Sequence, residues 1–376
     1  MATPNQPNVS TNAKSICLEY MNERSGLFLV FYPPLKRKWP KVASKRWGWR
    51  PGFKKYTVWR LSQTLMGMAS FIHHCTLLNQ PPAPKIPTRE LTDDETISQV
   101  VIKEILKTPP VETNNPKIAF LFLTPGQLPF EPLWAKFFQG HEGRFSVYVH
   151  ASKEKPVHTS HYFMGRDIHS ESVVSPKIAA IKMQVSWGKI SMVDAERRLL
   201  AKALLDSDNQ QFVLLSESCI PLQNFDYVYN YLMLTNVSFI DSFVDLGPHG
   251  SGRYSEHMMP EVEKDDFRKG SQWFSMKRQH AIIVMADSLY YTKFRYYCKP
   301  NMEGRNCYAD EHYLPTFFNM IDPVGIAKRS VTYVDWSERK WHPKSFKAED
   351  ITLKFLKNLT VSCHITLHFI YVPCLY

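Results

Sequence analysis

The stretch KIAFLFLT at residues 117–124 is apolar from its second to its seventh residue, and Pro125 and Gly126 end it. A continuous apolar run of this length, stopped by turn residues, is typical of a strand that is buried on both faces. Two stretches of the same kind follow, RFSVYVHAS at 144–152 and QFVLLSESCIPL at 211–222. The sequence therefore predicts three strands inside a mostly parallel sheet.

Helical patterns alternate with these strands. PLWAKFFQG at 132–140 predicts a short helix, and MVDAERRLLAKALLDSD at 192–208 repeats its apolar residues with the period of a helix. Further on, we expect a strand at 238–243, a strand turning into a helix at 270–287 and a late strand at 330–336. This alternation predicts an α/β fold with a Rossmann-like sheet flanked by helices. Ligands of such folds bind beyond the carboxyl ends of the strands.

The composition separates a folded body from a basic arm. The chain has 376 residues, of which 44% are hydrophobic, enough to bury a large core. Its formal charge is +11, and the segment from Arg24 to Arg60 alone carries eleven Lys and Arg. We interpret residues 1–60 as a basic, disordered cytosolic arm. A nucleic-acid binder is one alternative, because basic clusters attract polyanions, but the rest of the chain is nearly balanced in charge.

Residues 61–78, LSQTLMGMASFIHHCTLL, are a candidate membrane anchor. The segment is long enough to span a bilayer but carries Gln63, His73 and His74, so a soluble amphipathic helix is the alternative. The basic cluster on its N-terminal side would keep the N-terminus in the cytosol and send the rest of the chain into the lumen.

The candidate anchor is followed by a proline-rich segment at 79–116, which contains one short predicted helix and which we expect to form a stem. The folded domain then covers 117–360, and residues 361–376 form an abruptly apolar tail.

Cysteines and glycosylation motifs are compatible with an oxidising compartment. Cys298 and Cys307 bracket a short segment that could close as a disulfide loop, and the chain has no CxxC pair. Asn8, Asn236 and Asn358 each begin an N-x-S/T triplet, as in glycoproteins of the secretory route.

The stretch NCYADEHYLPTFFNM at 306–320 places a charged triplet at the start of an apolar helix. Its members are Asp310, Glu311 and His312, and we expect Pro315 within the first turn of the helix. Carboxylates at this end of a helix are stabilised by its dipole. These side chains therefore either cap the helix or carry out chemistry.

Metal chemistry has little support in the sequence. Asp206 and Asp208 form an Asp-x-Asp pair of the kind that binds a divalent metal in many sugar-nucleotide transferases, but they precede a strand instead of following one. At the correct edge stand Ser216, Glu217 and Ser218, which offer less oxygen charge than a hard cation prefers. GxGxxG, P-loop, GxSxG and HExxH signatures are absent from the chain. We therefore expect no metal.

Five segments occur in the order QVSWGKISMVDAERRLLAKAL, FVLLSESCIPL, GSQWFSMKR, YYCKPNMEGRNCYADEHYLPTFF and RSVTYVDW. Together they resemble the plant branch of the core-2/I-branching β-1,6-N-acetylglucosaminyltransferases, glycosyltransferase family 14, over residues 117–360. The resemblance implies a GT-A-like fold, a single-pass type II protein of the Golgi membrane and a UDP-sugar donor, with GlcNAc as the sugar. It also implies a glycan or glycoprotein acceptor and inversion at the anomeric carbon without a metal or other cofactor.

The same resemblance places the catalytic base on Glu311, with Asp310 and His312 to orient it or to cap the helix. A sugar hydroxyl is a poor nucleophile, so a carboxylate must take its proton as the new bond forms. One base is sufficient for a single displacement with inversion.

The diphosphate that leaves with the nucleotide carries two negative charges, and without a metal these require fixed cations. The resemblance assigns Arg329 to this position, where a guanidinium can contact phosphate with two donors. Lys344 is the nearest match to the second cation of the family, and Lys347 is its competitor.

For the rest of the donor, the resemblance points to residues at or near the strand ends. They are His150, Ser152, Trp187, Glu217 and Ser218. The animal enzymes hold uridine with a His-x-Asp where this chain has His150-Ala151-Ser152, so the acid is missing. On the acceptor side, Arg253 and Tyr254 lie in a loop at 249–260, and Trp273 could stack on a sugar face.

A catalytically silent, lectin-like carbohydrate-binding protein is the alternative to an enzyme. The missing uridine acid and the unusual apolar tail favour it.

Overall fold

The computed structural model describes residues 91–109, 112–168 and 185–335, together with residue 89 and short pieces between 337 and 372. The basic arm at 1–60 and the candidate anchor at 61–78 lie outside the described residues. Among the helices that are described, none combines the length and the apolar character needed to cross a membrane. The described residues from Leu91 onwards belong to one compact unit.

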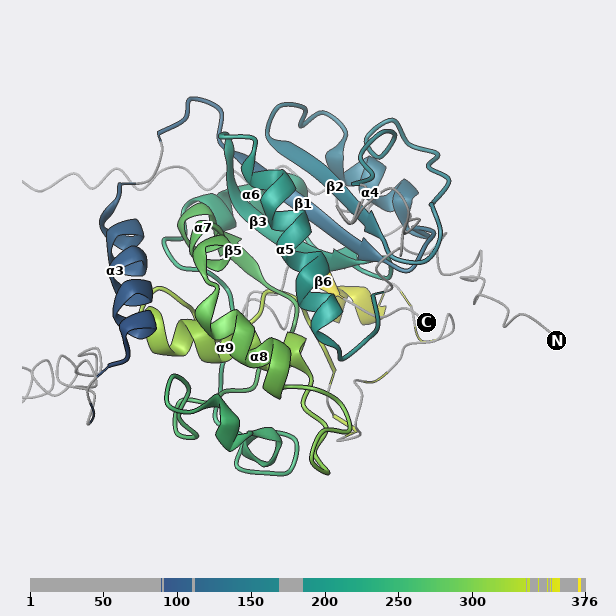
Figure 1. Cartoon of the computed structure of the whole chain (residues 1–376). Coiled ribbons are helices and arrows are strands. Elements are labelled where there is room, and N and C mark those ends of the chain that lie inside the picture. Colours follow the sequence, from purple (N-terminus) through teal and green to yellow (C-terminus); the bar gives the residue numbers. More distant parts are fainter. Residues whose placement is uncertain are drawn as a thin grey trace, which may run out of the picture. The chain divides into compact units, whose positions relative to one another are not determined.

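The centre of this unit is a four-stranded sheet with the strand order β2-β1-β3-β5 (Figure 1). β1 (Lys117–Thr124) pairs in parallel with β2 (Phe145–Ala151) on one side and with β3 (Asn209–Ser216) on the other. β5 (Ser275–Lys277) pairs antiparallel with β3. The three strands predicted from the sequence are confirmed, and the fold is α/β with a mostly parallel sheet, as in GT-A-like glycosyltransferases.

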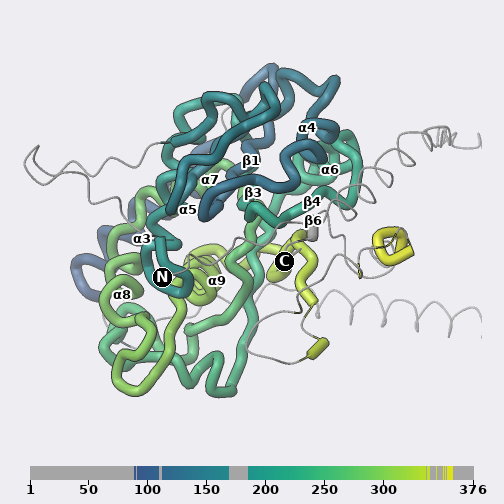
Figure 2. Tube along the Cα trace, turned by 90° about the vertical axis from the view of Figure 1, so that its right-hand side faces the viewer, coloured from purple at the N-terminus to yellow at the C-terminus, as the bar shows by residue number. Residues whose placement is uncertain are grey.

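Successive residues of β1 point into two different hydrophobic clusters. Leu121 packs with α5, α7, α8 and α9, whereas Phe120 and Phe122 pack with α4 and α6. Figure 2 shows the two groups of helices on opposite sides of β1 and β3. Because both faces are covered, the strands are apolar throughout and do not alternate. The helices are α3 (Asp93–Lys107), α4 (Glu131–Phe138), α5 (Ile190–Leu204), α6 (Phe225–Met233), α7 (Arg278–Ala286), α8 (Leu289–Tyr297) and α9 (Ala309–Ile321).

Two of the later strand predictions are wrong. Residues 238–243 form isolated bridges to three different partners, Ser238 to Ile326, Phe239 to Ser275 and Phe243 to Lys269, and a segment that changes partners cannot build a ladder. The described residues 330–335 form no strand either. The prediction for 270–287 is confirmed, since β5 leads directly into α7.

Short elements complete the described chain. Two single-turn helices, η1 (Ser251–Arg253) and η2 (Glu256–Met258), follow the segment at 238–243. Within the tail, β6 (Tyr371–Val372) pairs antiparallel with β4 (Ile220–Pro221) just after β3. Of the three glycosylation motifs, Asn236 and Asn358 have exposed side chains and Asn8 lies outside the described residues.

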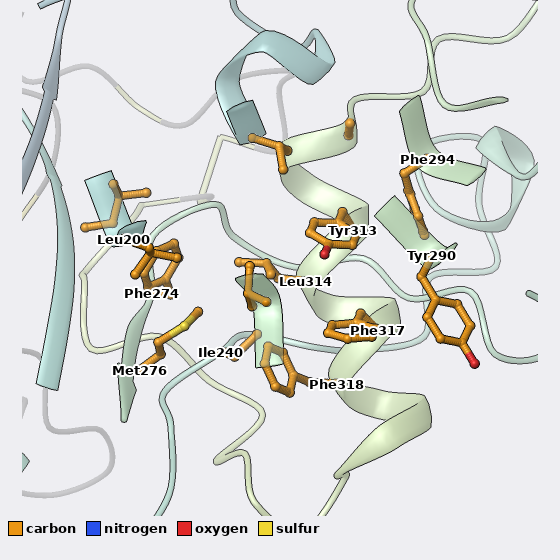
Figure 3. Packing of buried hydrophobic residues seen from close by; sticks show 14 of the residues in the cluster. Leu200, Ile240, Phe274, Met276, Tyr290, Phe294, Tyr313, Leu314, Phe317 and Phe318 are labelled. Carbon is orange, nitrogen blue, oxygen red and sulfur yellow. The ribbon is translucent and has the colours of Figure 1, made fainter. Parts of the chain in front are cut away.

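α9 packs between the sheet and α8. Figure 3 shows Tyr313 and Phe317 pointing toward Tyr290 and Phe294, while Leu314 and Phe318 point toward Ile240 and Met276. A disulfide between Cys298 and Cys307, with the Cα atoms 4.8 Å apart, joins the end of α8 to the residues just before α9. The start of α9 is therefore attached covalently as well as by packing.

Pro315 is the seventh residue of α9 and not a first-turn residue as expected. Proline has no backbone N–H, so the carbonyl of Glu311, four residues earlier, loses its partner within the helix. The backbone N–H of Gly270 donates to this carbonyl instead, at 2.9 Å. The proline thus creates an attachment point between α9 and the segment that leads into β5.

We expect Gly270→Ala to destabilise the fold. A Cβ at this position would overlap the backbone oxygen of Asp241 and lie 2.8 Å from Cγ of Pro315. Overpacking of this kind costs roughly 1–3 kcal/mol, which denaturant unfolding would measure. Gly252→Ala is the matched control, because the nearest atom to its Cβ is 3.3 Å away. Equal unfolding free energies for the two variants would contradict the close approach at Gly270.

Candidate active site

The predicted strand ends meet at the carboxyl edge of the sheet. Register places Thr124 beside Ala151 and Leu123 beside Ser216. The Ser152 N–H donates to the carbonyl of Thr124 at 2.9 Å. At the end of β3, the hydroxyls of Ser216 and Ser218 are 2.9 Å apart, and burial raises the pKa of the Glu217 carboxyl. His150, Ser152, Glu217 and Ser218 therefore share one edge.

His150 is a buried, neutral group at this edge. Its side chain is 1% exposed, and burial lowers its pKa to about 4, with the nearby charge of Arg198 as a second cause. Nε2 lies 3.5 Å from a guanidinium nitrogen of Arg198. Nδ1 is buried and has no hydrogen-bond partner among the described residues. This ring nitrogen is therefore unsatisfied within the described part of the chain.

Glu311 lies in the first turn of α9 and is held by Arg253. Nη1 of Arg253 donates to Oε2 of Glu311 at 2.7 Å, and the two side chains are 7% and 19% exposed. Among the described residues nothing donates to the second oxygen, Oε1. One oxygen of the carboxylate is therefore fixed, and the other can accept a hydrogen bond from a ligand.

Arg253 itself is fixed from two further directions. Its guanidinium lies over the ring of Tyr308 at 4.4 Å, and Nη1 lies 3.3 Å from Nε2 of His312. Nδ1 of His312 is 2.8 Å from the carbonyl of Arg268, so this nitrogen carries the proton and Nε2 accepts. Burial, with the charge of Arg253 as a second cause, lowers the pKa of His312 to about 3 and keeps the ring neutral.

Trp187 joins this cluster through Tyr308. The two rings are 4.9 Å apart, and Trp187 remains 53% exposed. A side chain on the following residue, Gly188, would place Cβ 2.6 Å from the Tyr308 ring. The loop before α5 therefore approaches the start of α9 closely, and it presents an open aromatic face near Glu311.

Asp310 points into the protein. It is 3% exposed, and burial, with the negative charge of Glu311 as a second cause, raises its pKa to about 7. Its Oδ1 has no hydrogen-bond partner among the described residues. The Asp310 side chain is therefore buried in the protein, whereas that of Glu311 is partly exposed.

The other residues assigned to the acceptor differ in exposure. Tyr254 is 4% exposed, and its hydroxyl donates to the carbonyl of Val262 at 2.8 Å. Tyr254 therefore stabilises the loop at 249–260 from its buried side. Trp273 is half-buried, and its carbonyl accepts from the hydroxyl of Ser330 at 2.9 Å. Contact of either residue with an acceptor stays a prediction.

Arg329 belongs to a different cluster from Glu311. Its guanidinium lies over the ring of Phe239 at 4.9 Å, and Nη2 donates to the hydroxyl of Tyr231 at 2.6 Å. Within the described part of the chain, no hydrogen bond or ion pair joins Arg329 to Arg253 or Glu311, and Nη1 of Arg329 is buried without a partner. The segment 270–273 connects the two clusters: the N–H of Gly270 donates to the carbonyl of Glu311, and the carbonyl of Trp273 accepts from the hydroxyl of Ser330.

The two lysine candidates are placed unequally. The N–H of Lys344 donates to the carbonyl of Asp335 at 2.8 Å, whereas Lys347 lies outside the described residues. A cavity of about 490 Å³ lies between α3 and α8, and none of the predicted site residues lines it.

The Asp-x-Asp pair lies at the opposite edge of the sheet. Asp206 and Asp208 both pair with Lys117, at 3.1 and 3.4 Å, where β1 begins. In the part of the chain that the structure describes, no cluster of three His, Cys, Asp or Glu could hold a metal ion.

Two comparisons with known proteins identify the family of this chain. The family model "Branch: Core-2/I-Branching enzyme" matches residues 118–360, which include the sheet, the Glu311 cluster and Arg329. The chain is also 34% identical over 281 residues to "Glycosyltransferase BC10" from Oryza sativa subsp. japonica, and the match covers 66% of this chain and 67% of the rice protein. The chain therefore belongs to the core-2/I-branching enzyme family and is a glycosyltransferase.

Proposed function

We propose that this glycosyltransferase moves a sugar, GlcNAc by resemblance to its family, from a UDP donor to a glycan hydroxyl with inversion. Glu311 is the general base. The observation that supports this most is the state of the Glu311 carboxylate, which Arg253 binds through Oε2 while Oε1 accepts no bond from the described residues.

The chemistry requires one proton acceptor. Oε1 of Glu311 takes the proton of the acceptor hydroxyl as that oxygen attacks the anomeric carbon. The bond from the anomeric carbon to the diphosphate breaks, and its electron pair leaves with UDP. Arg253 and the neutral His312 keep the carboxylate in one orientation, so little reorganisation accompanies the transfer. We therefore assign Arg253 to the base and not to the acceptor sugar.

Arg329 receives the charge of the leaving diphosphate. Its buried, unpartnered Nη1 supports this role, because a guanidinium nitrogen without a partner is costly unless a ligand binds it. The hydroxyl of Thr332 is also buried and unpartnered, three residues further on. Lys344 is the second cation. Fixed charges then replace the metal that other sugar-nucleotide transferases use.

The strand ends hold the nucleoside and the donor sugar. His150 offers a neutral ring with an available Nδ1, and Ser152, Glu217 and Ser218 lie at the same edge. Trp187, with its exposed face, packs against a sugar ring next to Glu311. On the acceptor side, Trp273 stacks on a sugar, and Tyr254 keeps the loop in place.

The proposal for the location of the enzyme rests on the sequence of segments outside the described residues. We propose a type II protein of the Golgi membrane with residues 61–78 as the anchor, because the basic cluster precedes this segment. A fluorescent fusion tests this directly, and deleting 61–78 would release the protein from the Golgi membrane.

Replacing the base tests the mechanism. We expect Glu311→Gln to lower kcat by about 100-fold or more, because general bases contribute 10²- to 10⁴-fold, while UDP binding is kept. The measurements are a transfer assay and calorimetry with UDP. Glu256→Gln, on an exposed acid of η2, is the control. Near-normal turnover of Glu311→Gln would show that another group is the base.

Arg329→Ala should weaken the binding of UDP. We expect UDP to bind roughly 10-fold more weakly or worse, since hydrogen bonds to charged groups are worth about 1.5–3 kcal/mol. Lys202→Ala, on the exposed side of α5, should leave UDP binding unchanged. Unchanged UDP affinity in Arg329→Ala would show that this residue does not contact the diphosphate.

Glycan binding with no UDP binding in the unmodified protein would favour the lectin-like alternative.

Metal independence gives a separate prediction. We expect transfer to continue at an unchanged rate in excess EDTA, because cationic side chains neutralise the diphosphate. Loss of transfer with EDTA, followed by recovery with Mn²⁺ or Mg²⁺, would contradict the proposal.

A further inference from the structure

Two helices that pack on each other, α5 and α9, each carry a buried carboxyl group. Glu196 of α5 is 2% exposed and Asp310 of α9 is 3% exposed. Each has one buried oxygen without a hydrogen-bond partner among the described residues, Oε1 of Glu196 and Oδ1 of Asp310. An unpartnered carboxyl oxygen is costly inside a protein, and two such oxygens at one helix interface require an explanation.

A side-chain contact also joins the two helices next to these groups. Nη1 of Arg197, the residue after Glu196, lies 3.4 Å from the hydroxyl of Tyr313. Tyr313 is one helical turn beyond Asp310 and therefore lies on the same side of α9. Glu196 and Asp310 are therefore two buried carboxyls with unpartnered oxygens on helices in contact, and the negative charge of Asp310 is a second cause, after burial, that raises the pKa of Glu196.

We propose that Glu196 is a positioning residue that donates a hydrogen bond from a protonated Oε1 to Oδ1 of Asp310 and thereby fixes the first turn of α9. One proton then gives both unpartnered oxygens a hydrogen-bond partner. Glu311 is the next residue after Asp310, so the pair sets where the base stands. This effect on turnover rests on the proposed role of Glu311.

The surroundings favour a proton on this pair. Burial is the main cause that raises the pKa of Glu196 well above its ordinary value, with the charges of Asp310 and Asp194 as further causes. The pKa of Asp310 rises to about 7, mainly through burial and also through Glu311. Arg253 acts in the opposite direction on Asp310. The other titratable or charged groups at this interface are Arg197 of α5, Tyr313 of α9, Tyr291 of α8, and Asp287 at the end of α7.

The sign of the pH effect follows from these shifts. Both folded pKa values lie above the ordinary values of 3.8 and 4.5, so the folded state binds more protons than the unfolded state above those values. The free energy of unfolding therefore falls as pH rises. The contribution of this pair is lost when both carboxyls are deprotonated. Two buried carboxylates beside Glu311 then repel one another and displace the first turn of α9.

The test compares Glu196→Gln and Glu196→Ala with the unmodified full chain. Gln carries a permanent donor that can replace the protonated carboxyl, whereas Ala carries none. We measure Tm and transfer from about pH 5 to about pH 9, a range that lies on both sides of the pKa of about 7 for Asp310. Glu104→Gln, on an exposed acid of α3 that pairs with Lys107, is the control and should match the unmodified protein at every pH.

We expect the Tm of Glu196→Gln to rise relative to the unmodified protein as pH increases, and its kcat to lose less at alkaline pH. Glu196→Ala should lose about 10-fold in kcat, in line with a lost charge-assisted hydrogen bond, with little change in KM, and Gln should restore most of that loss. A constant Tm offset across the pH range, or equal losses for Gln and Ala, would overturn the proposal. The Tm comparison does not depend on Glu311, so it separates failure of this inference from failure of the proposed mechanism.

Discussion

The ion pair between Arg253 and Glu311 is the interaction on which the account of this enzyme depends. It joins η1, between α6 and β5, to the start of α9 across 58 residues of sequence. Every partner of the pair is itself fixed. Tyr308 packs against the guanidinium, and His312 is held by the carbonyl of Arg268. The carboxylate is therefore oriented before any substrate binds, which is the condition for efficient proton removal.

The fold provides this orientation through backbone features as much as through side chains. Pro315 removes one hydrogen bond from α9 and makes the carbonyl of Glu311 available to Gly270. The disulfide between Cys298 and Cys307 attaches the residues just before the helix. Behind the base, Asp310 and Glu196 are both buried. The base thus stands on a rigid element instead of a mobile loop.

Much of this arrangement could be predicted from the sequence, and the reasons for the rest are physical. The buried strands, their shared carboxyl edge and the position of Glu311 at a helix start follow from periodicity and turn residues. The partner of Glu311 does not, because Arg253 is distant in sequence and an arginine in a loop carries no periodic signal. The strand expected at 238–243 failed for a similar reason, since its residues pair with three distant segments. Glu196 gave no signal either, because one acid in an amphipathic helix reads as a solvent-facing residue until its neighbours are known.

On the donor side, packing fixes the position of the proposed diphosphate ligand, Arg329. Arg329 packs on Phe239 and Tyr231, so its position is fixed while one of its nitrogens has no partner. The segment 270–273 connects Ser330 with the carbonyl of Glu311, which couples the proposed diphosphate site to the base through the backbone. The central claim is a single displacement in which Glu311 deprotonates the acceptor. Proton NMR of the transfer product tests it most directly: from an α-linked UDP-sugar the account predicts a β-linked product, and an α-linked product would contradict it.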